Sequence, residues 1–432
     1  MEKYPIQNER MFLRSPCINI CFRIIIEGII EKNIIEEAIK NIGIRHPFIK
    51  CSVEIDKDNN SWLIQKNGSS SIEYYKSNEM EWQNWFIKND NIPFNLSNET
   101  LLKYCVITGV NTEIIILGHH IIGDGIGYFN LIKDFLQALD GNVDLTPLIP
   151  PFKKEELKFK KTVPLNFMVK LFSKSLNNKW KKSRIKFSEN EYLDFFDEYR
   201  KTKKPNVYLF SIDKEKLEKI LEKCKINGLT VNELISSAFS VVLMEHFKRN
   251  DFELGVAINI RNELVSEPNK SMGNYVSGIN AKINYDLSND FFSNAKTITS
   301  KLKEQLKNLK NRHMVVNFLK YFDSDLLESL VYAAYGNCNH PISKKLAELV
   351  GERAKNKGLG ISNLGRHSFT EYKNIIVDNI QFIQPAFPKN ILTIGVITVS
   401  DNKMNFCFRF NENEIKTEDI KIICKKGIEL LV

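Results

Sequence analysis

The sequence predicts a mixed α/β protein, an α+β sandwich with two similar halves, and two observations support this fold class. The first is size and composition: 432 residues, of which 43% are hydrophobic, can bury more than one core at about 100–200 residues per domain. The second is that strand and helix patterns alternate both before and after a segment rich in lysine and proline. We therefore expect an N-terminal domain at residues 1–150, a basic linker or crossover at 151–204 and a C-terminal domain at 205–432.

The N-terminal half carries short apolar runs, which are typical of strands, between helical patterns. We expect strands at residues 18–30, 48–55, 62–65, 101–110 and 113–117, and helices at 33–44 and 80–88. A clearer helix follows, because Tyr128 begins an apolar stripe at positions i, i+3, i+4, i+7, i+8 and i+11. Asp140-Gly141-Asn142 is a typical stop for it.

The C-terminal half repeats the mixed pattern. We expect strands at residues 206–211, 253–260, 275–283, 375–383, 392–399 and 404–410. Helices are expected around 217–224, at 230–247, at 291–310 and from about 414 onward. Thr230 followed by Glu233 three residues later predicts a capping box at the start of the second of these helices.

The net charge of +9 is concentrated in one segment. Residues 151–204 contain 16 Lys and Arg against 7 Asp and Glu, a difference of +9, so the rest of the chain is close to neutral. Such a segment attracts a phosphorylated cofactor, an acidic carrier protein, a membrane surface or a nucleic acid, although a solvated linker or helix face is the simplest interpretation. We expect no nucleic-acid partner, because few aromatic residues are interleaved and no module signature is present.

The eight cysteines show neither a CxxC pair nor the spacing of a zinc site or disulfide framework. Most of them lie in apolar runs, which is typical of small core residues in a reducing compartment. The N-terminus lacks the apolar region of a signal peptide, and no run reaches the roughly 18–20 apolar residues that span a bilayer. We expect a cytoplasmic protein with no transmembrane segment.

The residues with the clearest chemical signal are His119-His120-Ile121-Ile122-Gly123-Asp124-Gly125, between an apolar strand and a helix. Three interpretations compete. In the first, the histidines pack and Asp124 caps the helix. In the second they bind a metal, but neighbouring strand residues point to opposite faces and no third-ligand motif is evident. In the third, a neutral imidazole acts as a general base.

This HHxxxDG segment resembles the signature of the superfamily of chloramphenicol acetyltransferase, nonribosomal peptide synthetase condensation domains, alcohol acetyltransferases and polyketide-associated acyltransferases. Further segments resemble the superfamily in the expected order and cover nearly the whole chain: Ile44–Lys50 the "RHPxLR" stretch, Thr230–Leu234 the "TVND" helix start, Val256–Arg261 a strand that ends in Arg, Met272–Val276 the "GN" strand and Ser362–Gly365 the "SNLG" strand. The "DFGWG" loop of plant-type members is absent.

The resemblance implies two chloramphenicol-acetyltransferase-like domains in a V, with a central tunnel. His120 would be the general base, and Asp124 would turn away from the substrate to pair with Arg261. His119 would be structural, and Gly125 would leave room for a thioester arm. Ser362 or Asn363 would help to hold an oxyanion.

The implied activity is transfer of an acyl group from a thioester, with acyl-CoA favoured, to an alcohol or amine. It needs neither a metal nor a covalently bound cofactor, since acyl-CoA or an acyl-phosphopantetheine carrier protein is the co-substrate. One alternative is a carrier-dependent condensation enzyme that forms an amide or ester in natural-product biosynthesis. Another is a non-catalytic binding member of the fold. We expect a stand-alone monomer; the acceptor, acyl length, donor carrier and oligomeric state stay open.

Overall fold

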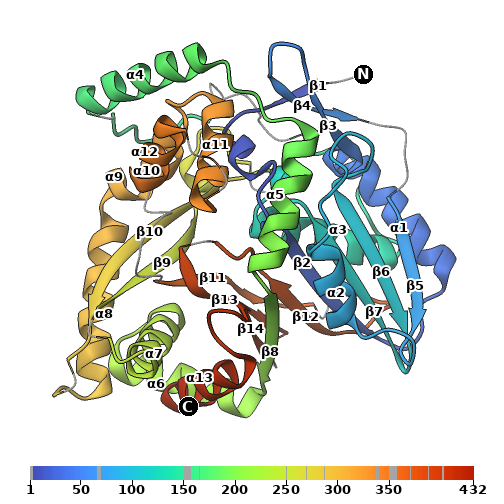
Figure 1. Cartoon of the computed structure of the whole chain (residues 1–432). Helices are drawn as coiled ribbons and strands as arrows, with labels where there is room; N and C mark the ends of the chain where they lie inside the picture. Colours follow the sequence, from blue (N-terminus) through green and yellow to red (C-terminus); the bar gives the residue numbers. More distant parts are fainter. Residues whose placement is uncertain are drawn as a thin grey trace.

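The computed structural model describes residues 3–65, 70–149, 157–164, 166–249, 251–268, 270–286, 288–336, 338, 340–349, 358–369, 371–387, 389–400 and 403–432. Two α/β halves lie side by side, each built around one large sheet (Figure 1). The predicted fold class is therefore confirmed. The first part of the expected basic segment, residues 151–156, lies outside the described ranges.

The sheet of the N-terminal half is covered by helices on both faces. Its spatial order is β12 (Val377–Ile383), β2 (Ile20–Glu27), β7 (Asn111–Gly118), β6 (Leu102–Thr108) and β5 (Ile72–Lys76). Ile114 and Ile116 of β7 face the core shared with α1 (Lys32–Arg45) and α3 (Gly125–Leu139). Ile115 and Leu117 face α2 (Trp82–Asp90) instead, because successive residues of a strand point to opposite faces. Because both faces of β7 are buried, its residues 114–117 form an unbroken apolar run.

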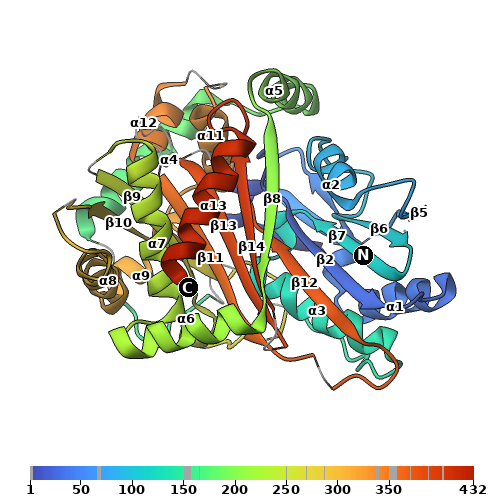
Figure 2. The same ribbon diagram turned by 90° about the horizontal axis from the view of Figure 1, so that it is seen from below.

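The sheet of the C-terminal half has a parallel centre. Its order is β10 (Val276–Asn284), β9 (Asp251–Asn259), β11 (Gly358–His367), β13 (Asn390–Val399), β14 (Lys403–Asn411) and β8 (Pro205–Ile212), and β11 runs parallel to both of its neighbours. One core joins this sheet to α6 (Lys214–Asn227), α7 (Val231–His246), α8 (Phe291–Lys307) and α13 (Thr417–Leu431). Figure 2 shows α6, α7 and α13 across one face of the sheet.

A small sheet and a group of helices complete the structure. The small sheet has the order β1 (Lys3–Ile6), β4 (Ser61–Gln65) and β3 (Cys51–Ile55), and short 3-10 helices are η1 (Asn8–Phe12), η2 (Pro47–Lys50), η3 (His120–Ile122) and η4 (Arg261–Glu263). The helices are α4 (Phe167–Ser183), α5 (Glu189–Thr202), α9 (Leu309–Arg312), α10 (Met314–Leu319), α11 (Ser324–Ala334) and α12 (Pro341–Leu349). Residues of α4, α5, α11 and α12 share one core around Trp180 and Leu326.

Two features differ from the sequence expectations. The segment expected as a linker contains α4 and α5, whose buried faces include Trp180 and Phe195, so it is largely helical and packed. The strand β12 lies in the C-terminal part of the chain but pairs with β2 of the N-terminal sheet. The division at 150 and 205 therefore does not separate the two sheets, and as a domain division it stays a prediction.

The predicted helix signals correspond to capped helices. Asp124 caps α3 by accepting a hydrogen bond from Gly127 N at 2.8 Å. The capping box of Thr230 and Glu233 is present at the start of α7. The helix expected at 291–310 ends earlier, at Lys307, because the Asn308 side chain caps the short helix α9 instead.

In the described part of the chain, no helix taken singly has both the length and the apolar composition needed to cross a bilayer. The helices α6 and α7 pass that test only as a pair, and they are bent by 96° relative to each other. All eight cysteines are free and buried, as the apolar runs around them predicted.

Candidate functional site

The HHxxxDG segment connects the end of β7 to the start of α3. Gly118 ends the strand, His119 and His120 enter η3, and Asp124 is the N-cap of α3. The hydroxyl of Tyr128, in the first turn of α3, donates to the carbonyl oxygen of His119 at 2.8 Å. The strand end and the helix start are thus held together, and the loop between them presents His120.

Asp124 is almost wholly buried, and both of its carboxylate oxygens accept hydrogen bonds. Oδ1 accepts from Gly127 N and from Arg261 Nη2, and Oδ2 accepts from Arg261 Nη1 and Tyr275 N, all at 2.8 Å. The ion pair between Asp124 and Arg261 that the resemblance implied is therefore present, in the bidentate geometry that favours arginine over lysine. The carboxylate is thus engaged on both oxygens in holding the loop to its partners.

The partners of Asp124 come from the C-terminal half of the chain. Arg261 lies in η4, just after β9, and its Nη2 also donates to the carbonyl oxygen of Gly273 at 3.2 Å. Asp124 N donates to the same carbonyl at 3.1 Å. Gly273 has φ +119°, and a Cβ atom there would lie 2.8 Å from the Tyr275 ring, so glycine is required. These contacts bind the HHxxxDG loop of the N-terminal half to residues of the C-terminal half.

His119 has a structural environment. Its Nδ1 accepts a hydrogen bond from Ile121 N at 3.2 Å, and the edge of its ring meets Phe94 with 5.6 Å between ring centroids. Burial, together with the neighbouring His120, lowers the pKa of His119 to about 3. The ring is therefore neutral at physiological pH, which fits packing and backbone support.

His120 is buried but differs from His119 in its contacts. Its ring is 4.4 Å from the ring of Phe12 and stacked on it, and only 4% of the residue is exposed. Burial lowers its pKa, against the opposing influence of its own carbonyl, Asp124 and Asn274, so a neutral imidazole is favoured. The Nδ1 atom is enclosed and has no hydrogen-bond partner among the residues that the structure describes.

Asn274 fixes the backbone beneath His120. Its Nδ2 donates to the carbonyl oxygens of His120 and Ile121, at 2.8 and 3.2 Å. A small cavity of about 20 Å³ borders this point, between Ile121, Asn274 and Glu9. A cavity of that size has room for about one water molecule.

The other predicted site residues have different surroundings. Beside Gly125, a Cβ atom would lie 3.1 Å from Phe382 Cζ and 3.2 Å from Leu364 Cδ2, so these side chains pack closely against the glycine. The role of Gly125 in leaving room for a thioester arm stays a prediction. Ser362 and Asn363 lie on β11, and Asn363 Oδ1 accepts from Gly365 N at 2.8 Å. Within the described ranges no hydrogen bond joins either of them to His120 or Asp124, so the oxyanion role stays a prediction.

Three residues beside the motif were not identified as functional from the sequence. Phe12 covers the His120 ring, Asn274 holds its carbonyl, and Tyr275 places its ring 4.8 Å from the Arg261 guanidinium carbon. Asn274 and Tyr275 belong to the recognised "GN" stretch, which was a usable signal. Phe12 carried no such signal in the sequence, because its contact with the His120 ring forms only in the folded chain. His46, in the stretch that resembles "RHPxLR", is buried with Nε2 2.7 Å from Asp134 Oδ2.

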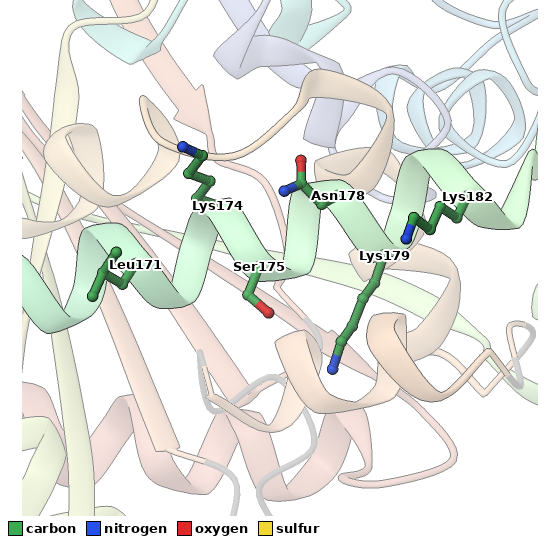
Figure 3. A pocket seen from close by; sticks show the side chains of 6 residues that line it. All are labelled: Leu171, Lys174, Ser175, Asn178, Lys179 and Lys182. Atoms are coloured by element: carbon green, nitrogen blue, oxygen red, sulfur yellow. The ribbon is translucent and has the colours of Figure 1, made fainter.

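A larger surface groove lies away from the motif. It has a volume of about 390 Å³ and runs along α4, where its lining is Leu171, Lys174, Ser175, Asn178, Lys179 and Lys182 (Figure 3). Its lining carries three lysines and no acidic side chain, which makes the local potential positive. In the described part of the chain, no three His, Cys, Asp or Glu side chains gather to hold a metal ion.

Comparisons with known proteins agree with this arrangement. The sequence profile of the condensation domain family matches residues 9–312. Bacitracin synthase 1 of Bacillus licheniformis is 23% identical over 381 residues, which are 82% of this chain and 6% of that protein. The chain thus spans a tenth or less of the length of the curated relatives it matches.

Solved structures share the fold along the whole chain. The first condensation domain of the calcium-dependent antibiotic synthetase superposes with a TM-score of 0.65 at 11% identity, covering 100% of this chain and 96% of that one. The trichothecene 15-O-acetyltransferase TRI3 of Fusarium sporotrichioides gives 0.68 at 11% identity, covering 99% and 95%. Identity this low shows the fold alone, but the family match covers more than half of the sequence. The chain belongs to the condensation domain family.

Proposed function

We propose that this protein transfers an acyl group from a thioester donor to an alcohol or amine acceptor, with His120 as the general base. The observation that carries the proposal is the state of His120: a buried imidazole with a lowered pKa, on a loop whose carboxylate is already engaged by Arg261. A base must be unprotonated at working pH and held in place, and both conditions are met. Membership of a family of acyl-transferring enzymes supports the same reaction.

We assign the steps of the acyl transfer to the following groups. Nε2 of His120 removes the proton of the acceptor as its oxygen or nitrogen bonds to the thioester carbonyl carbon. The tetrahedral intermediate then collapses, the carbon–sulfur bond breaks, and the imidazolium returns the proton to the departing sulfur. Asp124 takes no proton, because Arg261, Gly127 N and Tyr275 N occupy its oxygens. The thioester is consumed as a co-substrate, and we propose no resident cofactor.

The donor is either acyl-CoA or an acyl group on a carrier protein. Both present a phosphate and a pantetheine arm, so both suit a basic surface. The helix α4 provides such a surface, because it contains five lysines and no acidic residue, and Lys174, Lys179 and Lys182 line its groove. The alternative of a carrier-dependent condensation enzyme, forming an amide or ester in natural-product biosynthesis, therefore has support equal to that of the acyl-CoA enzyme.

The test compares thiol release by the wild-type protein, by His120→Ala and by His246→Ala. His246 lies at the end of α7 and is a control for loss of a histidine elsewhere. Each protein is supplied with acyl-CoA or with acyl carrier protein, and with an alcohol or an amine acceptor. We expect His120→Ala to lose about 10²–10⁴-fold in rate, the usual contribution of a general base. The control should retain wild-type turnover.

Each outcome decides between the alternatives. Turnover by His120→Ala at the wild-type rate would show that another group is the base. Release from the carrier protein but not from CoA would select the condensation-type enzyme. Absence of transfer with every donor and acceptor pair, while the wild-type protein still binds acyl carrier protein, would favour the non-catalytic binding alternative.

A further inference from the structure

We propose that Phe12 is a positioning residue for His120, held over the imidazole by the buried ion pairs of Arg10 and Arg14 with Glu328. The catalytic consequence rests on the proposed function. The contact itself does not, since it is a property of the folded chain.

The orientation of the His120 imidazole depends on the groups around it. Hydrogen bonding from a carboxylate is a usual way to fix a catalytic histidine, but Asp124 has both oxygens engaged elsewhere. Asn274 binds the carbonyl oxygen of His120, which fixes the backbone beside the ring. The enclosed Nδ1 has no hydrogen-bond partner among the described residues. Packing against the face of the ring is therefore a further contribution to its orientation.

The packing partner is Phe12. The two rings are stacked, with 4.4 Å between centroids and 29° between planes. A stacked ring restricts rotation of the imidazole about its Cβ–Cγ bond, because tilting would push it into the phenyl face. It also covers one face of the imidazole.

Phe12 lies at the end of η1, and two arginines beside it hold this helix in place. Arg10 and Arg14 are one helical turn apart and lie on either side of Phe12 in the sequence. Arg10 Nε donates to one carboxylate oxygen of Glu328 at 2.8 Å, and Arg14 Nη1 donates to the other at 2.5 Å. These side chains are 1%, 3% and 1% exposed for Arg10, Arg14 and Glu328, respectively.

This cluster has further polar partners. Arg10 Nη2 donates to the side-chain oxygen of Asn59 at 2.9 Å, and Arg14 lies 3.8 Å from the half-exposed carboxylate of Glu189. Two arginines thus face two carboxylates, which balances the charge. Because buried ions tolerate little displacement from their partners, the cluster fixes η1 against α11 more strictly than apolar contacts would. The helix α11 thereby controls the environment of a base far away in the sequence.

The experiment uses the full-length protein labelled with ¹³C at Cε1 of histidine. The His120 resonance is assigned by its loss in His120→Gln and titrated in wild type, Phe12→Ala, Phe12→Tyr and Phe239→Ala. Phe239 is a wholly buried phenylalanine of α7 in the other core, so it controls for loss of a buried ring. Thiol release over pH is measured in parallel.

We expect Phe12→Ala to raise the pKa of His120 toward the ordinary histidine value and to lower kcat/KM by at least about tenfold, the scale of a misplaced catalytic group. Phe12→Tyr retains the stacked ring and should restore both. Phe239→Ala should lower stability while the His120 resonance and its pKa stay as in wild type. If Phe12→Ala does not fold, Phe12→Leu takes its place, since it keeps apolar bulk and lacks the ring.

Glu328→Gln tests the anchor without touching His120. It should shift the His120 resonance in the same direction as Phe12→Ala. An unchanged His120 titration in Phe12→Ala or Phe12→Leu would overturn the positioning role, and an unchanged one in folded Glu328→Gln would overturn the anchoring role. If the wild-type protein transfers no acyl group while these shifts occur, the proposed function fails and the positioning of His120 by Phe12 stands.

Discussion

Asp124 and Arg261, 137 positions apart, form a bidentate ion pair in which both N–O distances are 2.8 Å. The aspartate belongs to the loop of the N-terminal half that carries His120, and the arginine follows a strand of the C-terminal sheet. The loop that carries His120 is therefore supported from the other half of the molecule. Movement of one half relative to the other would alter the loop directly.

Removal of one charge from this pair should be strongly destabilising. We expect Asp124→Asn to lower the free energy of unfolding by about 3–5 kcal/mol, because Arg261 would remain buried without an anion. Arg261→Lys should lower it less, since the charge stays while the bidentate geometry is lost. Denaturant unfolding measures both. The double variant Asp124→Asn/Arg261→Gln should be more stable than the summed losses of Asp124→Asn and Arg261→Gln predict, and simple additivity would contradict a direct pair.

The rate of acyl transfer should depend on pH through His120. A general base works when it is unprotonated, and burial places the pKa of His120 below the ordinary value of 6.5. We therefore expect kcat/KM to be constant from about pH 7 to 8 and to fall only as the pH drops through that lowered pKa. A pH–rate profile with a stable thioester donor measures this. If the decrease in kcat/KM were centred above pH 7, a group other than His120 would be responsible for it.

Acid should destabilise the fold partly through His119. Its pKa is about 3 in the folded protein and 6.5 in the reference state, so the unfolded chain binds a proton that the folded chain excludes. The stabilisation is complete above pH 6.5 and declines as the pH falls from 6.5 toward 3, by about 1.4 kcal/mol per unit. His119→Asn keeps a neutral acceptor for Ile121 N and should flatten this decline. Equal acid sensitivity of both proteins in denaturant unfolding would exclude His119 as the source.

The lysine groove on α4 should affect donor binding and not chemistry. We expect Lys174→Glu/Lys179→Glu/Lys182→Glu to raise KM for a carrier-bound donor about tenfold at low salt, with kcat unchanged, because charge reversal removes attraction at long range. The matched control reverses Lys214, Lys216 and Lys219 on α6, an equal change in net charge. Equal effects of the two triple variants would show that net charge matters and the groove does not.

Much of the secondary structure could be predicted because its signals are local. The apolar stripe of α3, the capping box of α7 and the period-2 pattern of β2 each depend on residues within a few positions of one another. The helices α4 and α5 were missed because the lysine and proline content of 151–204 suggested a solvated linker. Trp180 and Phe195 lie in the buried faces of these helices. Apolar residues at helical spacing were therefore present in the sequence, but the high lysine content favoured the linker prediction.

The sequence by itself determined which residues are proposed for the site: the HHxxxDG segment with His120 as the proposed base and Asp124 as its support, and Arg261 as the partner that the resemblance implied. Only the tertiary structure decided that Phe12 covers His120, that Glu328 anchors Arg10 and Arg14, and that Phe382 fills the space beside Gly125. The physical reason is the range of the interactions. Motifs and caps follow from neighbouring residues, whereas stacking, buried ion pairs and the entry of β12 into the N-terminal sheet depend on how distant segments pack.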